Sequence, residues 1–188
     1  MNIKRIVKHL FVTDGQVKRA FPRSTLKAIE RAIAASESEH TGEIRFAVEG
    51  ALDGGPLFKG HSSHERAVDV FSQLRVWDTQ KNTGLLIYLL IADRTVEIVV
   101  DRGIHDKVAP QEWEKICRQM EPAFKQSDFE KGVIAGVQAV TLHLKAHFPA
   151  DGSDRNKLPN KPVILDGTAQ RSREAHDRRP IGSDSLSN

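Results

Sequence analysis

The stretch KNTGLLIYLLIADRTVEIVVDRG, from Lys81 to Gly103, decides the fold of this chain. Its first part, GLLIYLLIA, is apolar on both alternating faces, which is typical of a central strand covered on both sides by other layers. Asp93 and Arg94 interrupt the run and predict a turn, after which TVEIVVD places apolar side chains at every second position. We therefore predict a β-hairpin in the middle of a sheet.

Helical and strand patterns alternate on both sides of this hairpin. Residues 24–40, 62–77, 110–124 and 128–148 carry apolar side chains at helical spacing, whereas residues 43–50 alternate as a half-buried strand does. A strand, a crossover helix and a second strand predict a parallel pair. The sequence thus predicts an α/β fold, a three-layer α/β/α sandwich whose small mixed sheet combines a parallel pair with an antiparallel hairpin strand.

The helix boundaries carry their own signals. Ser24 follows a proline and is the expected N-cap of the first of these helices, and Gly42 is expected to close it. Ser62 or Ser63 is expected to cap the next helix, because Glu65 stands in its first turn.

Two segments flank a domain that we expect over residues 24–149. Residues 1–23 are expected to pack on that domain. Residues 150–188 are polar and rich in Pro, Gly, Ser and charge, so we expect a disordered tail, although its patch KPVILDG could dock on a partner or on the domain itself. The N-terminal segment could instead rest at a membrane surface with Lys4, Arg5 and Lys8 outward. Its apolar residues recur at helical spacing: Ile3, Ile6, Val7, Leu10 and Phe11.

Charge and composition indicate which partners and which cellular compartment to expect. The chain has 28 basic and 25 acidic residues in interleaved positions, so its net charge of +3 does not indicate nucleic-acid binding. The single cysteine, Cys117, lies on an amphipathic helical pattern and is expected to be a buried structural thiol in a reducing compartment. We expect no signal peptide and no transmembrane segment, and therefore a location in the cytoplasm, where a partner could hold the protein at the membrane. We also expect a monomer.

Several short motifs in a fixed order resemble the TPM domain family over residues 24–148. The family commonly shows Asn-Gly before the central strand, Asp-Arg at the hairpin, a Gly-x-Gly after the third strand and a Pro-x-Phe-x-x-Gly-Asp-Tyr-x-x-Gly run before the last helix. The matching positions are Asn82, Gly84, Asp93, Arg94, Gly103, Pro122, Phe124, Asp128, Phe129 and Gly132, with Asp101 in place of the first glycine of the Gly-x-Gly.

The resemblance implies an α/β/α sandwich from a bacterial member of the family. Plant relatives are associated with photosystem repair and a modest acid phosphatase activity, some members bind calcium, and one animal relative is an auxiliary subunit of a receptor. Bacterial members often carry a signal peptide and a membrane anchor. The resemblance therefore implies a protein partner, such as a membrane protein, or a phosphatase reaction.

Two ends of the predicted sheet offer candidate sites. At one end, Asp78, Asn82 and Asp101 could converge as oxygen ligands of calcium or magnesium, with Arg102 or Lys81 available to an anion. Ordinary loop chemistry remains the alternative for these residues: a turn residue, an amide bonded to its own backbone and a paired carboxylate.

The opposite end carries the second candidate group: Asp53, Asp93 and Arg94, beside a glycine-rich loop whose backbone could approach a phosphate. Open α/β sheets bind ligands beyond the carboxyl ends of their parallel strands, which favours this end. Two functions from different classes follow. The preferred one is an accessory or interaction module linked to the maintenance of membrane proteins, and the alternative is a weak phosphatase that depends on a divalent cation.

Overall fold

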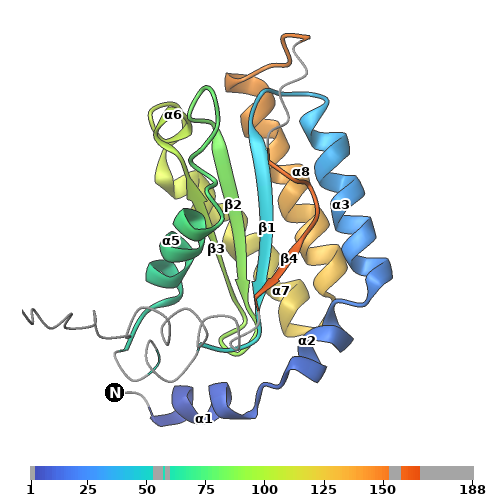
Figure 1. The fold of residues 1–188 in the computed structure, drawn as a ribbon, viewed down its shortest axis with the longest axis vertical. Coiled ribbons are helices and arrows are strands. Elements are labelled where there is room, and N and C mark those ends of the chain that lie inside the picture. Colours follow the sequence, from blue (N-terminus) through green and yellow to red (C-terminus); the bar gives the residue numbers. More distant parts are fainter. Residues whose placement is uncertain (1–2, 53–56, 58–59, 153–157, 166–188) are drawn as a thin grey trace, which may run out of the picture.

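The computed structural model describes residues 3–52, 57, 60–152 and 158–165 (Figure 1). The helices are α1 (Ile3–Phe11), α2 (Asp14–Ala20), α3 (Arg23–Glu37), α5 (Ser63–Gln73), α6 (Arg102–His105), α7 (Pro110–Lys125) and α8 (Phe129–His147). The strands are β1 (Glu43–Glu49), β2 (Gly84–Leu90), β3 (Thr95–Val100) and β4 (Val163–Leu165). None of the helices in these ranges is long and apolar enough to cross a membrane.

The sheet has the predicted mixed topology, with one additional strand. Its order is β3-β2-β1-β4, in which β1 and β2 are parallel and β2 and β3 form the antiparallel hairpin. Every residue of β2 is buried, because both faces of the sheet are covered. Leu85, Ile87 and Leu89 pack with α3, α7 and α8, and Leu86, Tyr88 and Leu90 pack with α5 on the other face (Figure 1). The three-layer α/β/α prediction is confirmed.

The helix boundaries differ from the sequence expectation at both ends of α3 and at the end of α5, which stops at Gln73 rather than at residue 77. Helix α3 begins at Arg23 with Pro22 as its N-cap, because the amide of Leu26 already donates to the carbonyl of Pro22. It ends at Glu37, well before Gly42. The cap of α5 is confirmed: the Ser62 hydroxyl accepts from the Glu65 amide, and the Glu65 carboxylate accepts from the Ser62 amide.

The segment after residue 150 is ordered in part, which corrects the expectation of a wholly disordered tail. Val163–Leu165 pair in parallel with residues 47–49 of β1, so the described part of the KPVILDG patch docks on the domain itself. Leu158 is buried, and its amide donates to Oε2 of Glu43 at 2.6 Å. Composition predicted disorder, but the open edge of β1 supplies backbone partners that a three-residue apolar strand can use.

Candidate functional site

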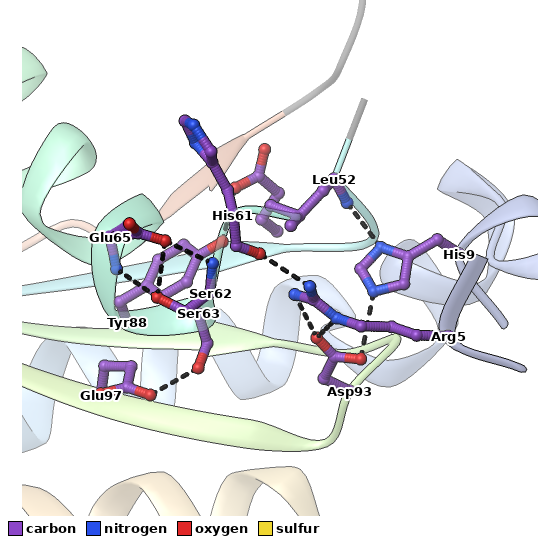
Figure 2. A network of polar contacts seen from close by, with 11 residues as sticks. Arg5, His9, Leu52, His61, Ser62, Ser63, Glu65, Tyr88, Asp93 and Glu97 are labelled. Atoms are coloured by element: carbon purple, nitrogen blue, oxygen red, sulfur yellow. Dashed lines mark hydrogen bonds and ion pairs between the residues drawn. The ribbon is translucent and has the colours of Figure 1, made fainter. Parts of the chain in front are cut away.

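The hairpin turn holds helix α1 across the carboxyl end of the parallel strands. Asp93 lies in that turn, and its Oδ2 is 2.8 Å from both Nε and Nη2 of Arg5. The third guanidinium nitrogen, Nη1, donates to the backbone carbonyl of His61 at 2.7 Å (Figure 2). Arg5 therefore ties α1 to the hairpin and to the residues that precede α5.

His9 makes the second connection, one helical turn after Arg5. Its Nδ1 accepts a hydrogen bond from the amide of Leu52 at 2.9 Å, so the ring proton sits on Nε2, which donates to Oδ1 of Asp93 at 3.1 Å (Figure 2). The ring is buried, and both of its nitrogens are used. This His–Asp pair resembles a general-base dyad in composition, but it is a structural clamp, because no ring nitrogen is left to accept a proton from a substrate.

The charge on Asp93 is secured by its partners. Burial alone would raise the pKa of this carboxyl group, but the hydrogen bonds from His9 and Arg5, together with the positive charge of Arg5, outweigh burial and lower the pKa below its usual value. Asp93 is therefore a carboxylate over the whole neutral range, and the clamp on α1 persists there.

The clamp turns the polar face of α1 inward and most of its apolar face outward. Arg5 and His9 point to the domain, and Ile6 alone of the apolar stripe is packed against the core. The exposed fractions of the other apolar residues are large: 69% for Ile3, 44% for Val7, 70% for Leu10 and 73% for Phe11. Lys4 and Lys8 of the same helix are exposed as well.

This orientation corrects two expectations about the N-terminal segment. Val17 and Phe21 do pack in the core, but four of the five apolar residues expected to pack from α1 face outward. Arg5, which the membrane-surface alternative placed outward with Lys4 and Lys8, is turned to the domain. The reason is the buried acceptor: the Asp93 carboxylate needs donors, and the i and i+4 positions of α1 supply them.

A groove adjoins the exposed face of α1. It has a volume of about 690 Å³ and lies between α1, α2, the β2–β3 hairpin and the turn before α8. Phe11, Val12 and Ile91 contribute apolar walls, and the charged residues that line it, Lys8 and Arg94, are both basic. Arg94 thus lies at this end of the sheet as predicted. Asp53 and the neighbouring Gly54 and Gly55 lie outside the described residues.

At the opposite end of the sheet, the structure gathers part of the predicted cation site. Asp101 caps α6 through a hydrogen bond from the Arg102 amide to Oδ1 at 2.7 Å. The Arg102 guanidinium donates to Oδ1 of Asn82 at 3.2 Å, so Asn82, Asp101 and Arg102 lie together. Within the described residues, the other carboxylate oxygen of Asp101 is buried and has no hydrogen-bond partner.

The remaining residues of that prediction are placed differently. The Lys81 ammonium pairs with Asp151 at 2.8 Å on the surface. The Asp78 amide closes the turn after α5 by donating to the Arg75 carbonyl, and within the described ranges no polar contact joins its carboxylate to Asp101. No three His, Cys, Asp or Glu side chains of the described part of the chain converge as metal ligands. The cation site remains a prediction.

A buried charged network lies beneath α5 and was not foreseen from sequence. Arg66 forms two hydrogen bonds with the carboxylate of Glu49, at 2.8 and 3.0 Å, and the Tyr88 hydroxyl donates to the same carboxylate at 2.6 Å. Burial, with the nearby charge of Glu49, raises the pKa of Tyr88 far above its ordinary value, so Tyr88 stays a neutral donor. The network fixes α5 on the sheet, and its members come from three separate elements, which no local pattern reveals.

The fold defines the protein as an α/β domain with a four-strand mixed sheet between layers of helices. Residues 16–142 match the family model of the TPM domain, and the chain belongs to that family. The match begins after α1 and ends before β4, so the exposed surface of α1 and the docked tail strand both lie outside it.

Solved structures of bacterial proteins share this fold. The NMR structure of BA42 from the psychrophilic bacterium Bizionia argentinensis has 31% identity and a TM-score of 0.66, covering 76% of this chain and 93% of that one. The N-terminal domain of a protein from P. gingivalis has 20% identity and a TM-score of 0.54, covering 66% and 76%, which shows the fold alone. The search of curated proteins gave no match.

Proposed function

We propose that this protein is an accessory binding module that attaches to anionic membrane surfaces through the outward face of α1. The observation that carries the proposal is the inverted orientation of that helix. Soluble proteins rarely leave four large apolar side chains together on one exposed helix face, because their burial is favourable. Such a face marks an interaction site.

Basic residues beside the apolar face of α1 favour an anionic partner. Lys4 and Lys8 flank the apolar side chains on α1, and Lys18 and Arg19 are exposed on α2. Apolar residues beside lysines are the composition of helices that lie in the interface of an anionic bilayer, where each basic residue contributes about 1 kcal/mol. The clamp on Asp93 presents this face already folded, so little ordering entropy opposes binding.

Liposome flotation tests the proposal with the full chain. We expect it to float with vesicles of phosphatidylcholine and phosphatidylglycerol and to stay below with phosphatidylcholine alone. The double variant Leu10→Ser, Phe11→Ser should bind about thirtyfold more weakly, since partial insertion of two large side chains is worth about 2 kcal/mol.

Leu142→Ser is the matched control. Leu142 is 71% exposed on α8, as much as Leu10 on α1, and it lies away from the proposed surface. Equal loss of flotation in the control and the double variant would refute the proposal, as would flotation that ignores the lipid charge.

A divalent-cation-dependent phosphatase is the second candidate, and one observation favours it. Asp101 keeps a buried carboxylate oxygen without a hydrogen-bond partner in the described structure, beside Asn82 and Arg102. An oxygen of this kind is a potential cation ligand, and a guanidinium beside it could stabilise phosphate charge.

Titration of the labelled protein with calcium and then magnesium tests this candidate by NMR. Saturable amide shifts at residues 78–82 and 101–103, lost in Asp101→Ala, would establish the cation site and justify phosphatase assays. An absence of saturable shifts at millimolar ion would exclude cation-dependent chemistry at this end of the sheet.

A further inference from the structure

The edge of the sheet at β3 lies in a groove between two helices. The groove has a volume of about 590 Å³ and runs along Val96–Val100. Helix α5 contributes His64 and Val68 to one wall, and α7 contributes Trp113 and Cys117 to the other. It shares no lining residue with the groove beside α1.

Within the part of the chain that the structure describes, the backbone of β3 has no strand partner on this side. The amide of Asp101, directly after the strand, donates to the Gly84 carbonyl at 2.9 Å. Because hydrogen-bonded positions alternate along an antiparallel ladder, the backbone N–H and C=O groups of Thr95, Glu97 and Val99 also point toward β2. The amides and carbonyls of the intervening residues, Val96, Ile98 and Val100, therefore point into the groove, where the Cys117 thiol of α7 already makes a hydrogen bond with the Ile98 backbone. In the described structure, β3 ends the sheet, and no further strand pairs with it.

The other edge of the same sheet shows what such an edge binds. There β1 pairs with Val163–Leu165, an extended apolar segment from this chain. A three-residue strand is too short to persist by itself, so its docking depends on backbone pairing with the edge and on apolar contacts. The β3 edge offers the same two kinds of contact, and no strand of the described residues covers it.

We propose that the β3 edge binds an extended peptide segment of a partner protein by strand addition, between α5 and α7. Main-chain hydrogen bonds to Val96 and Val100, and to Ile98 in place of the weaker contact with the Cys117 thiol, would supply affinity, and alternate side chains of the peptide would contact the apolar walls. This site goes beyond the proposed membrane attachment and does not depend on it.

The charges of the groove define the segment. Three carboxylates lie along it, those of Glu97, Glu114 and Glu121, against the single guanidinium of Arg118. Each has a partner: Glu97 accepts from the Ser63 hydroxyl and contacts His64 at 3.3 Å, Glu114 pairs with Arg118 at 3.4 Å, and Glu121 contacts Lys125 at 3.9 Å. The Glu114 and Glu121 pairs lie toward solvent and contribute little, so the lining keeps more carboxylates than cations. A segment that alternates apolar residues with lysine or arginine is complementary to this rim. A second copy of the chain fits less well, because an antiparallel β3–β3 pair would bring the Glu97 carboxylates of two copies near each other.

The test is an NMR titration of the isotopically labelled full chain with a short, blocked peptide that alternates valine and lysine. We expect saturable shifts and slower hydrogen exchange at the amides of Val96, Ile98 and Val100. The same peptide with N-methylated backbone amides should not bind, because strand addition needs its N–H groups.

Variants separate this site from the surface of α1. Val68→Lys, at a position 42% exposed in the groove wall, should weaken peptide binding about tenfold by charge repulsion, whereas Leu142→Lys should leave it unchanged. Val68→Lys should keep liposome flotation, and Leu10→Ser, Phe11→Ser should keep peptide binding.

Three results would overturn the inference. One is an absence of saturable shifts at β3 with millimolar peptide, and another is equal binding of the N-methylated peptide. The third is a concentration-dependent shift of the same amides without peptide, which would mean that copies of the chain pair with each other.

Discussion

Replacement of Asp93 by Asn should release α1 while the rest of the fold stays intact. The carboxylate accepts from two nitrogens of Arg5 and from Nε2 of His9, whereas an amide of the same size has one oxygen and places an NH₂ group against one of those donors. At least one of these donors therefore loses its acceptor in Asp93→Asn.

The size of the effect follows from the burial of the partners. A hydrogen bond to a charged group contributes about 1.5–3 kcal/mol, but the Arg5 side chain is 22% exposed and regains part of that from water. We expect a loss of about 2 kcal/mol. A helix as short as α1 is not stable without tertiary contacts, so the loss should appear as local opening.

Hydrogen exchange measured by mass spectrometry resolves this local opening. Amides of α1 should exchange about thirtyfold faster in Asp93→Asn, and those of β2 should keep their protection, since 1.4 kcal/mol corresponds to a factor of ten. Asp151→Asn is the matched control, because Asp151 pairs with Lys81 at 2.8 Å on the surface and such pairs contribute at most about 1 kcal/mol. The reasoning would be refuted if α1 exchanged no faster in Asp93→Asn than in the control, or if β2 lost protection equally.

Two further predictions concern stability. Burial raises the pKa of Glu37 from 4.5 to about 7. The protonated Glu37 therefore contributes fully to the free energy of unfolding below pH 4.5, and this contribution is lost as pH rises through about 7, a change of about 2–3 kcal/mol. Urea unfolding of wild type and Glu37→Gln across this pH range should show the loss as a change in the difference between their free energies of unfolding. Burial lowers the pKa of His40, which has the opposite effect on stability, but His40 is present in both proteins and cancels in the difference. Parallel curves of stability against pH would contradict the prediction. Gly103→Ala should cost about 1–3 kcal/mol in the same assay, because its Cβ would lie 2.6 Å from the Asn82 backbone carbonyl oxygen, and wild-type stability would contradict that packing.

The hairpin and the layers could be predicted because their signals are local. The run in β2 is apolar on both faces, and its neighbours alternate, so the pattern defines a covered strand and its antiparallel partner without knowledge of tertiary contacts. The cap of α5 was equally readable, since Ser62 and Glu65 satisfy each other within one turn.

The candidate binding surface could not be predicted in the same way. The spacing of apolar residues shows which side chains of α1 share a face, but not whether that face meets the domain or solvent. The deciding acceptor, Asp93, lies 88 residues from Arg5 and 84 from His9. The tail strand could not be predicted for the same reason, because Val163–Leu165 pair with an edge more than a hundred residues earlier in the chain.

The direction of β4 has a practical consequence for work with this protein. Because β4 runs parallel to β1 and pairs Leu165 with Glu49, the chain passes Leu165 at the end of the sheet where α1 lies. A bulky reporter inserted directly after Leu165 would therefore crowd the surface that flotation experiments probe. The loop at Asp151 and Gly152, tied to Lys81 at the opposite end of the sheet, is the better position for a fluorophore or a surface tether.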